Sequence, residues 1–223
     1  MLKILSFDTS TEMCSAALKI GEKLLARQHL APQKHAELLL PMISELLIDA
    51  QLGIDQLDAI AFGQGPGSFM GLRIGVGVVQ GLAYGANKPV IAVSSLQAIA
   101  QTAYERYGIT RVAASIDARM QALYWGLYEL DEHKIMQAVR DDSLIEPQAL
   151  RNEDLSSWVA AGQGWQVYAN EHALSFAETY SELYPMASAM LDIATYKFKQ
   201  QEFQSAEEAE PYYLRNQVVA TKA

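Results

Sequence analysis

The sequence Gly63-Gln64-Gly65-Pro66-Gly67-Ser68-Phe69-Met70-Gly71-Leu72-Arg73-Ile74-Gly75-Val76-Gly77 joins a short apolar stretch to a long, glycine-containing one. Residues 58–62, just before it, are typical of a buried strand, and Gly65-Pro66-Gly67 can adopt the backbone conformations that a sharp exit from such a strand requires. Apolar residues then recur at helical spacing over residues 69–83, and Ser68 is in the place of an N-cap. The segment therefore predicts a strand, a tight turn and a helix.

The glycines of the predicted helix indicate close packing. Each of the five costs a helix up to about 1 kcal/mol relative to alanine. Gly71 and Gly75 form one row with four-residue spacing, and Gly77, Gly81 and Gly85 form another. Because rows of small residues let a second backbone approach closely, we expect this helix to pack tightly against another element.

The glycine turn at residues 63–67 has two interpretations, a structural turn and a turn that also faces a ligand. A Walker-type phosphate loop needs a lysine before its serine or threonine, whereas Ser68 follows Gly67 directly. A dinucleotide-binding fingerprint needs an acidic partner for the ribose farther on, and that requirement is not met either.

The composition predicts a globular protein with a sizeable core, because half of its 223 residues are apolar. The longest apolar runs are broken well short of a bilayer span, and no secretory leader is recognisable, so we expect no membrane segment. Cys14 is the single cysteine, which excludes an intramolecular disulfide and favours the cytoplasm. Its apolar neighbours predict a buried, inert thiol.

The net charge is −9 at pH 7, from 17 basic and 26 acidic residues. The basic residues are scattered along the chain, and such a surface repels a polyanion on average. If the protein acts on nucleic acid, we expect another chain to supply the phosphate contacts.

Residues 3–8, 14–20 and 23–30 predict an antiparallel meander whose first turn contains Asp8-Thr9-Ser10-Thr11. A carboxylate and three hydroxyls can hold a phosphate or a hydrated metal ion, so Asp8, Thr9 and Ser10 are candidate cofactor-binding residues. The alternative is an Asx or Ser/Thr turn that satisfies its own backbone, and the local sequence favours this alternative.

Residues 34–50 predict a second helix with an apolar stripe and further apolar residues outside it. Such a helix is deeply buried or contacts a partner. Pro41 predicts a kink or an irregular first turn, and His35 is expected to be a polar residue near the helix start. We expect this helix and the glycine-containing helix, residues 68–84, to form a partner interface that includes Leu38, Leu39, Met42, Leu46, Gly71, Leu72, Gly75, Val76 and Val79.

From residue 111 the pattern of the first half restarts. Asp117 follows a predicted strand at the place that Asp8 holds in the first half, and this repetition indicates an internal duplication. The acidic residues Glu207, Glu208 and Glu210 predict a solvated segment. Further strands are predicted at residues 89–93, 111–116, 122–129 and 134–140, and further helices at 96–106 and 187–200.

A duplicated meander with an aspartate turn in each half resembles the actin, Hsp70 and sugar-kinase (ASKHA) superfamily. Three segments also resemble the bacterial TsaB family in order and spacing, namely Ser6-Phe7-Asp8-Thr9-Ser10-Thr11, the glycine-containing string at residues 65–75 and Pro211-Tyr212-Tyr213-Leu214-Arg215. The string at residues 65–75 is highly specific. The resemblance implies an α/β, two-lobed, actin-like and ribonuclease H-like fold with mixed sheets flanked by helices. Its first lobe is expected at residues 1–105 plus about 190–223, and a reduced second lobe at 106–189.

The resemblance also implies a non-catalytic scaffold subunit. Its relative TsaD transfers a threonylcarbamoyl group from threonylcarbamoyl-adenylate to N6 of the adenosine beside the anticodon of tRNA. The implied partners are a TsaD-like paralogue, a small TsaE-like ATPase, and a second copy of this chain when TsaD is missing. Contact with tRNA is expected only through the complex, and ATP or ADP only at the level of the complex, with no tightly bound cofactor in this chain.

In TsaD the strand equivalent to residues 90–93 is followed by a His-x-x-x-His metal pair, one helical turn apart. The corresponding residues here are Ser95 and Ile99. Isoleucine cannot ligate a metal and serine is a poor ligand, so the resemblance implies neither a metal site nor catalytic residues in this chain.

Two alternative functions remain open. A metal-dependent glycopeptidase, a class with which the relatives have been grouped, needs metal ligands or a nucleophile beside a base. Neither the four histidines nor Cys14 forms such a constellation in the sequence. A free-standing nucleotide-binding kinase or ATPase needs an adenosine pocket, and the chain after Gly164 has no convincing glycine-rich adenosine motif.

Overall fold

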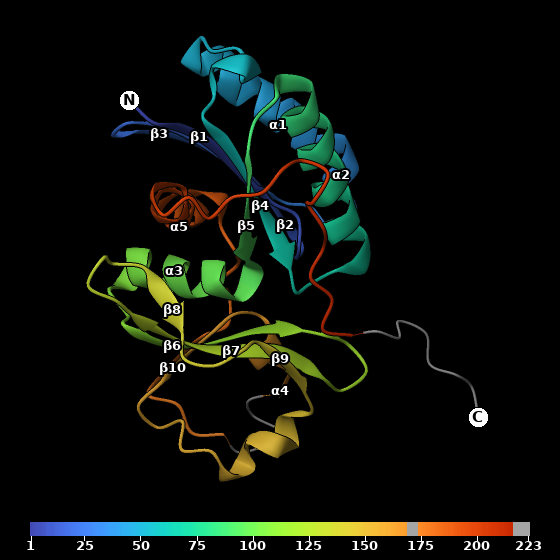
Figure 1. Ribbon diagram of the computed structural model, residues 1–223. Coiled ribbons are helices and arrows are strands. Elements are labelled where there is room, and N and C mark those ends of the chain that lie inside the picture. The colour runs from blue at the N-terminus through green and yellow to red at the C-terminus, as the bar shows by residue number, and fades with distance from the viewer. Residues whose placement is uncertain (169–173, 216–223) are drawn as a thin grey trace, which may run out of the picture.

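The computed structural model describes residues 1–168 and 174–215, which form two mixed β-sheets with helices between and around them (Figure 1). The expected α/β fold, with mixed sheets flanked by helices, is confirmed. The limits expected for the two lobes stay a prediction, and the parts of them at residues 169–173 and 216–223 lie outside the described residues.

The first sheet has five strands in the order β3-β2-β1-β4-β5. Strands β1 to β3 form the expected antiparallel meander, whereas β4 and β5 run parallel to β1. Phe7 of β1 pairs with Phe62 of β4, so Asp8 and the glycine turn come to the same edge of the sheet. The strands are Lys3–Asp8 (β1), Met13–Ile20 (β2), Lys23–Leu30 (β3), Ala59–Gly65 (β4) and Val90–Ser94 (β5).

The second sheet repeats the strand order of the first. Its order is β11-β10-β6-β7-β8, with β9 paired to β7. If β6 is matched to β1, then β7 and β8 match β2 and β3, and β10 and β11 match β4 and β5, with the same strand directions. The predicted duplication is thus present in the topology. The strands are Arg111–Asp117 (β6), Leu123–Leu130 (β7), Met136–Ala138 (β8), Ser143–Ile145 (β9), Val159–Ala161 (β10) and Glu178–Tyr180 (β11).

The helices make three layers around the two sheets (Figure 1). Helices α1 and α2 cover the outer face of the first sheet, α3 and α5 lie between the sheets, and α4 lies on the far face of the second sheet. Two short 3₁₀ helices, Ile54–Gln56 (η1) and Pro147–Asn152 (η2), complete the described elements. The α-helices are His35–Ala50 (α1), Phe69–Ala86 (α2), Ser95–Tyr107 (α3), Gly164–Tyr168 (α4) and Ala187–Lys199 (α5).

Alternation along the strands divides the first sheet between two cores. Leu5 and Phe7 of β1 point to α1 and α2, and the intervening positions point to α5. On the α5 side the neighbouring strands carry the small residues Ala17, Ala59 and Ala61, which are fully buried. Small side chains let a helix lie close to a sheet, so α5 completes the first lobe from the far end of the sequence.

The predicted strand at residues 134–140 is wrong in its limits, because only Met136–Ala138 forms β8. Lys134 has a left-handed backbone with φ of 64°. Asp131 Oδ1 accepts hydrogen bonds from the backbone N–H groups of His133 and Ile135, at 2.9 and 2.8 Å. This carboxylate-stabilised turn occupies residues that β-propensity alone assigns to the strand.

Helix α2 contains both glycine rows, and they meet different surroundings. Ser68 caps the helix as predicted, because its Oγ accepts a hydrogen bond from the Gly71 N–H at 3.3 Å. A Cβ at Gly71 would overlap the Thr9 carbonyl, and one at Gly75 would lie 2.7 Å from Thr9 Oγ1. The second row, Gly77, Gly81 and Gly85, has open space at every Cβ position. The close approach expected from the glycines is therefore made at the first row by the chain's own β1–β2 turn.

One substitution at two positions of α2 should have opposite effects on the free energy of unfolding. Gly71→Ala forces a methyl group against the Thr9 backbone and should destabilise the protein by about 1–3 kcal/mol. Gly77→Ala enters open space in the same helix and should stabilise it by about 0.5–1 kcal/mol. Urea unfolding of the two variants and the wild-type chain measures both changes, and equal effects at the two positions would contradict this packing.

Candidate functional site

The turn between β1 and β2 is buried and closed by its own hydrogen bonds. Asp8, Thr9 and Ser10 are at most 1% exposed. Asp8 Oδ1 accepts hydrogen bonds from the Ser10 N–H and hydroxyl, both at 2.8 Å, and Thr9 Oγ1 donates to the Gly71 carbonyl at 2.7 Å. The three candidate cofactor-binding residues lie together, but inside the protein, in the Asx turn that the local sequence favours.

The glycine turn after β4 lies directly on the β1–β2 turn. A Cβ at Gly63 would overlap the Asp8 carboxylate, and a Cβ at Gly67 would overlap the Ser10 backbone. The Ser68 N–H donates to the Ser10 carbonyl at 2.7 Å. The two turns pack tightly against each other and share a backbone hydrogen bond. The need for glycine at residues 63 and 67 is therefore explained by packing within the chain, as the structural interpretation of the turn predicts.

The start of α3 contacts the same aspartate. Ser95 Oγ donates to Asp8 Oδ2 at 3.4 Å, and Ser94 Oγ caps α3 by accepting from the Gln97 N–H at 3.4 Å. Ile99, one turn further, is buried in the core between α3 and the second sheet. Within residues 1–168 and 174–215, no group of three or more His, Cys, Asp or Glu side chains could hold a metal ion.

A second, partly buried carboxylate, Asp142, connects the two sheets at the start of α3. Tyr128 OH donates to Asp142 Oδ1 at 2.5 Å, and Ser94 Oγ donates to its Oδ2 at 2.7 Å. Burial raises the pKa of Asp142. Sequence reasoning missed this residue, because an aspartate in an Asp-Asp pair between short strands carries the signature of an ordinary solvated loop.

The C-terminal strap, residues 211–215, runs from the glycine turn to the second lobe. The Tyr212 N–H donates to the Gln64 carbonyl at 2.7 Å, and the Tyr213 ring packs on Phe69 with 5.5 Å between centroids. Arg215 then donates to the Arg119 carbonyl at 3.3 Å, in the turn between β6 and β7. The strap thus covers the edge of the first sheet where Asp8 and the glycine turn meet.

The structure corrects the residues expected at the partner interface. Leu39, Met42, Leu46 and Val79 are at most 3% exposed and belong to the core beneath α1 and α2, and Leu72 is 1% exposed beside Gly65. They hold the two helices on the sheet, so they have no surface to offer a partner. Gly71, Gly75 and Val76 are also buried, whereas Leu38 is half-buried at the edge of the core and stays a prediction for the interface.

The solvent side of α1 and α2 nevertheless exposes several apolar residues, beside charged ones such as Glu45 and Asp49. Leu40 and Ile48 of α1 are 48% and 70% exposed, and Met70 and Tyr84 of α2 are 64% and 72% exposed. Around α2 this side also contains the open glycine row. We call these seven residues the open helix face, namely Leu40, Ile48, Met70, Gly77, Gly81, Tyr84 and Gly85. An interface on the two helices stays a prediction, with these residues in place of the buried ones.

Helix α2 is long and apolar enough to cross a membrane by length and composition alone. Its inner side packs on the first sheet, with Leu72, Val79 and Ala83 at most 1% exposed. A helix that packs on the core of a globular protein can have the same length and composition, and α2 packs on the core in this way.

Burial determines the electrostatics of the aspartate turn. It raises the pKa of Asp8 from 3.8 to about 6, against the lowering effect of the hydrogen bonds from Ser10 and Ser95. Burial and the nearby Asp8 raise the pKa of Cys14 to about 12, which fits the predicted inert thiol. Asp8 is therefore protonated more readily in the folded state than in the unfolded state. Protonation of Asp8 stabilises the folded state at low pH, and this stabilisation is lost as the pH rises through about 6.

Comparison with known proteins gives related sequences over the full length of the chain. A family model described as TsaD, tRNA N6-adenosine threonylcarbamoyltransferase, matches residues 25–220. The tRNA threonylcarbamoyladenosine biosynthesis protein TsaB of Escherichia coli (strain K12) is 40% identical over 227 residues, which cover 99% of this chain and 98% of that protein. The tRNA N6-adenosine threonylcarbamoyltransferase of Novosphingobium aromaticivorans is 47% identical over 68 residues, only 30% of this chain and 19% of that enzyme.

A solved structure has the same fold. YeaZ from Pseudomonas aeruginosa superposes with a TM-score of 0.91 at 41% identity, covering 96% of this chain and 100% of that chain. The similarity includes both lobes, so it extends well beyond the specific string at residues 65–75.

Asp8→Asn should stabilise the protein in a pH-dependent manner. The amide keeps the acceptor oxygen for Ser10 and removes the buried charge, so the variant should be more stable by about 1–3 kcal/mol near pH 7.5. The gain should shrink by about 1 kcal/mol near pH 5, where most of the wild-type Asp8 is protonated in the folded state. Urea unfolding at both pH values measures this.

Taking the difference in unfolding free energy between Asp8→Asn and the wild-type chain cancels the contributions of other titrating groups. Glu105, whose pKa burial raises to about 7, is present in both and cancels in the difference. A gain of the same size at both pH values would contradict the titration of a buried Asp8.

Proposed function

The chain belongs to the TsaD family and, within it, to the TsaB proteins of tRNA threonylcarbamoyladenosine biosynthesis, and on this premise we propose that it is a non-catalytic subunit of the modifying complex. Its proposed partner is a TsaD-like threonylcarbamoyltransferase, which carries out the transfer to N6 of adenosine. The observation that carries the proposal is the open helix face, where exposed apolar side chains surround a row of uncovered glycines.

The residues around Asp8 support an accessory rather than a catalytic role. At the positions that the family resemblance gives to a metal pair, this chain has a serine bonded to Asp8 and an isoleucine in the core. The β1–β2 turn, which would hold a phosphate, uses its polar groups within the chain and is covered by the glycine turn. A buried turn of this kind supports the fold and leaves reaction chemistry to the partner.

The open helix face supports a helix-to-helix contact. Glycines at four-residue spacing let the helix of a partner approach α2 closely, and Leu40, Ile48, Met70 and Tyr84 provide apolar surface around them. A TsaD-like paralogue of the same fold would offer helices of matching geometry. A second copy of this chain would cover the same surface when the paralogue is absent.

The charge of the chain supports indirect contact with tRNA. With a net charge of −9, phosphate contacts are more favourable on a partner than on this subunit. We place a TsaE-like ATPase as the third member of the complex, with ATP or ADP bound at that level.

A reconstituted reaction tests the accessory role. Threonylcarbamoyl transfer to tRNA is measured with TsaD-like and TsaE-like proteins, with and without this chain. Omitting the chain should lower the rate by at least about tenfold, equivalent to 1.4 kcal/mol in the barrier. The chain alone should modify no tRNA. Equal rates without the chain, or modification by the chain alone, would overturn the proposal.

Variants of the open helix face test the interface itself. Gly81→Trp and Ile48→Asp should each weaken binding to the TsaD-like partner by at least about tenfold, because one blocks close approach and the other buries a charge. Both positions are open or exposed, so urea unfolding should change little. Calorimetry or co-elution measures the binding.

Lys199→Trp is the matched control, because this exposed residue ends α5 between the sheets, away from the open helix face. It should bind like the wild-type chain. Undiminished binding by both interface variants would exclude this face. Gly75 is unsuitable for the test, because a side chain there meets Thr9 within the chain.

A further inference from the structure

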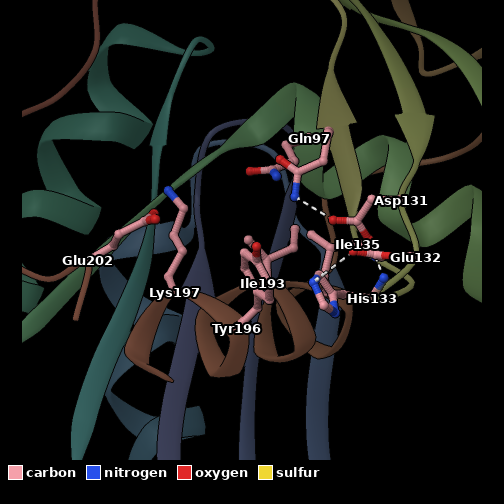
Figure 2. Close-up of a pocket in the computed structure, with 10 residues that line it drawn as sticks. Gln97, Asp131, Glu132, His133, Ile135, Ile193, Tyr196, Lys197 and Glu202 are labelled. Atoms are coloured by element: carbon pink, nitrogen blue, oxygen red, sulfur yellow. Dashed lines mark hydrogen bonds and ion pairs between the residues drawn. The ribbon is translucent and has the colours of Figure 1, made fainter. Parts of the chain in front are cut away.

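A cavity of about 400 Å³ lies between α5, the first turn of α3 and the hairpin that joins β7 to β8 (Figure 2). Its volume is within the range of small-molecule sites. Ile135 and Ile193, 4% and 1% exposed, provide buried apolar surface in its lining. The rings of His133 and Tyr196 pack at its side with 5.3 Å between centroids. The cavity is separate from the open helix face, so an occupant would go beyond the function proposed above.

Lys197 gives this cavity a positive charge on one wall. Its Nζ donates to the Ala92 carbonyl on the edge strand β5 at 2.9 Å, which uses one of its three N–H donors. In the part of the chain that the structure describes, Lys197 forms no ion pair, although Glu202 lies beside it in Figure 2. Burial lowers the pKa of Lys197, and Glu202 opposes this shift. Two donors of a half-buried amine are therefore available to a ligand.

The facing wall carries carboxylates. Figure 2 shows Asp131 and Glu132 across Ile193 from Lys197. Asp131 is fixed, because Oδ1 accepts two backbone N–H groups and Oδ2 accepts the Gln137 amide at 2.9 Å. Burial raises the pKa of Asp131, but these hydrogen bonds together outweigh that effect, so the net shift of its pKa is downward. Glu132 is close by and its side chain is 88% exposed.

The charges select the class of ligand. A simple anion would meet Lys197 but would be repelled by Asp131, Glu132 and Glu202. A simple cation would meet the carboxylates but would be repelled by the positive charge of Lys197. A molecule with both charges, separated by a few ångströms and carrying an apolar part, satisfies both walls and the isoleucines between them.

We propose that this cavity binds a small zwitterion, a free α-amino acid, with its carboxylate at Lys197 and its ammonium group at Asp131 and Glu132. The apolar side chain of the ligand rests on Ile135 and Ile193. Tyr196 and His133 limit its size.

The test measures binding of each of the twenty standard L-amino acids to the full chain by calorimetry and by chemical-shift changes at Gln97 and Tyr196. Acetate and ethylamine, which carry one charge each, are the comparison ligands. At least one amino acid should bind at about 10 mM or below, and at least about tenfold more tightly than either comparison ligand. Binding of none of the twenty, or equal binding of acetate or ethylamine, would overturn the proposal.

Variants assign the binding to this cavity. Lys197→Met should weaken the amino acid at least about tenfold, and Glu132→Gln about threefold, because the carboxylate at Lys197 is the more desolvated end. Lys199→Met, on the same helix but outside the lining, is the matched control and should bind as the wild type does. Because Lys197 also donates a hydrogen bond to β5, the melting temperature of the Lys197→Met variant is measured as well. Glu132 is exposed on a turn, and unchanged binding in Glu132→Gln would contradict the orientation even if Lys197→Met unfolds.

Discussion

The contact between the β1–β2 turn and the glycine turn is the constraint on which the rest of the structure depends. Asp8 and Ser10 fill the space that a side chain at Gly63 or Gly67 would need, and Thr9 reaches over the start of α2 to the Gly71 carbonyl. Parallel pairing of β1 with β4 brings the two turns together. Once they interlock, the direction of α2 is fixed, and with it the layer that α1 and α2 form on the outer face of the sheet.

The same interlocking separates the two sides of α2. Its inner glycines are taken up by the chain's own backbone, while its outer glycines remain uncovered. The β1–β2 turn, which resembles a phosphate site, is an internal contact that fixes the inner side of α2 and leaves the outer side exposed. The inner side of this one helix stabilises the fold, and its outer side carries part of the open helix face.

Much of the fold follows from the sequence, because periodicity and turn residues act locally. The meander, the cap at Ser68 and the repeat of the aspartate turn at Asp117 all have such local causes. Periodicity shows which residues share a face, but not what covers that face. For that reason Leu39 and Leu72 were assigned to a partner although the sheet covers them. Asp142 and Lys197 could not be found at all, since their environments are made by elements far away in the sequence.

The position of α5 in the sequence has a consequence for folding during synthesis. The five strands of the first sheet are complete by Ser94, but α5, which covers their inner face, begins only at Ala187. All the described strands of the second sheet are synthesised in between. The alanines on the inner face of the first sheet therefore stay uncovered by α5 while more than a third of the protein is synthesised. The first lobe begins to form earlier than the second, but its core is completed later.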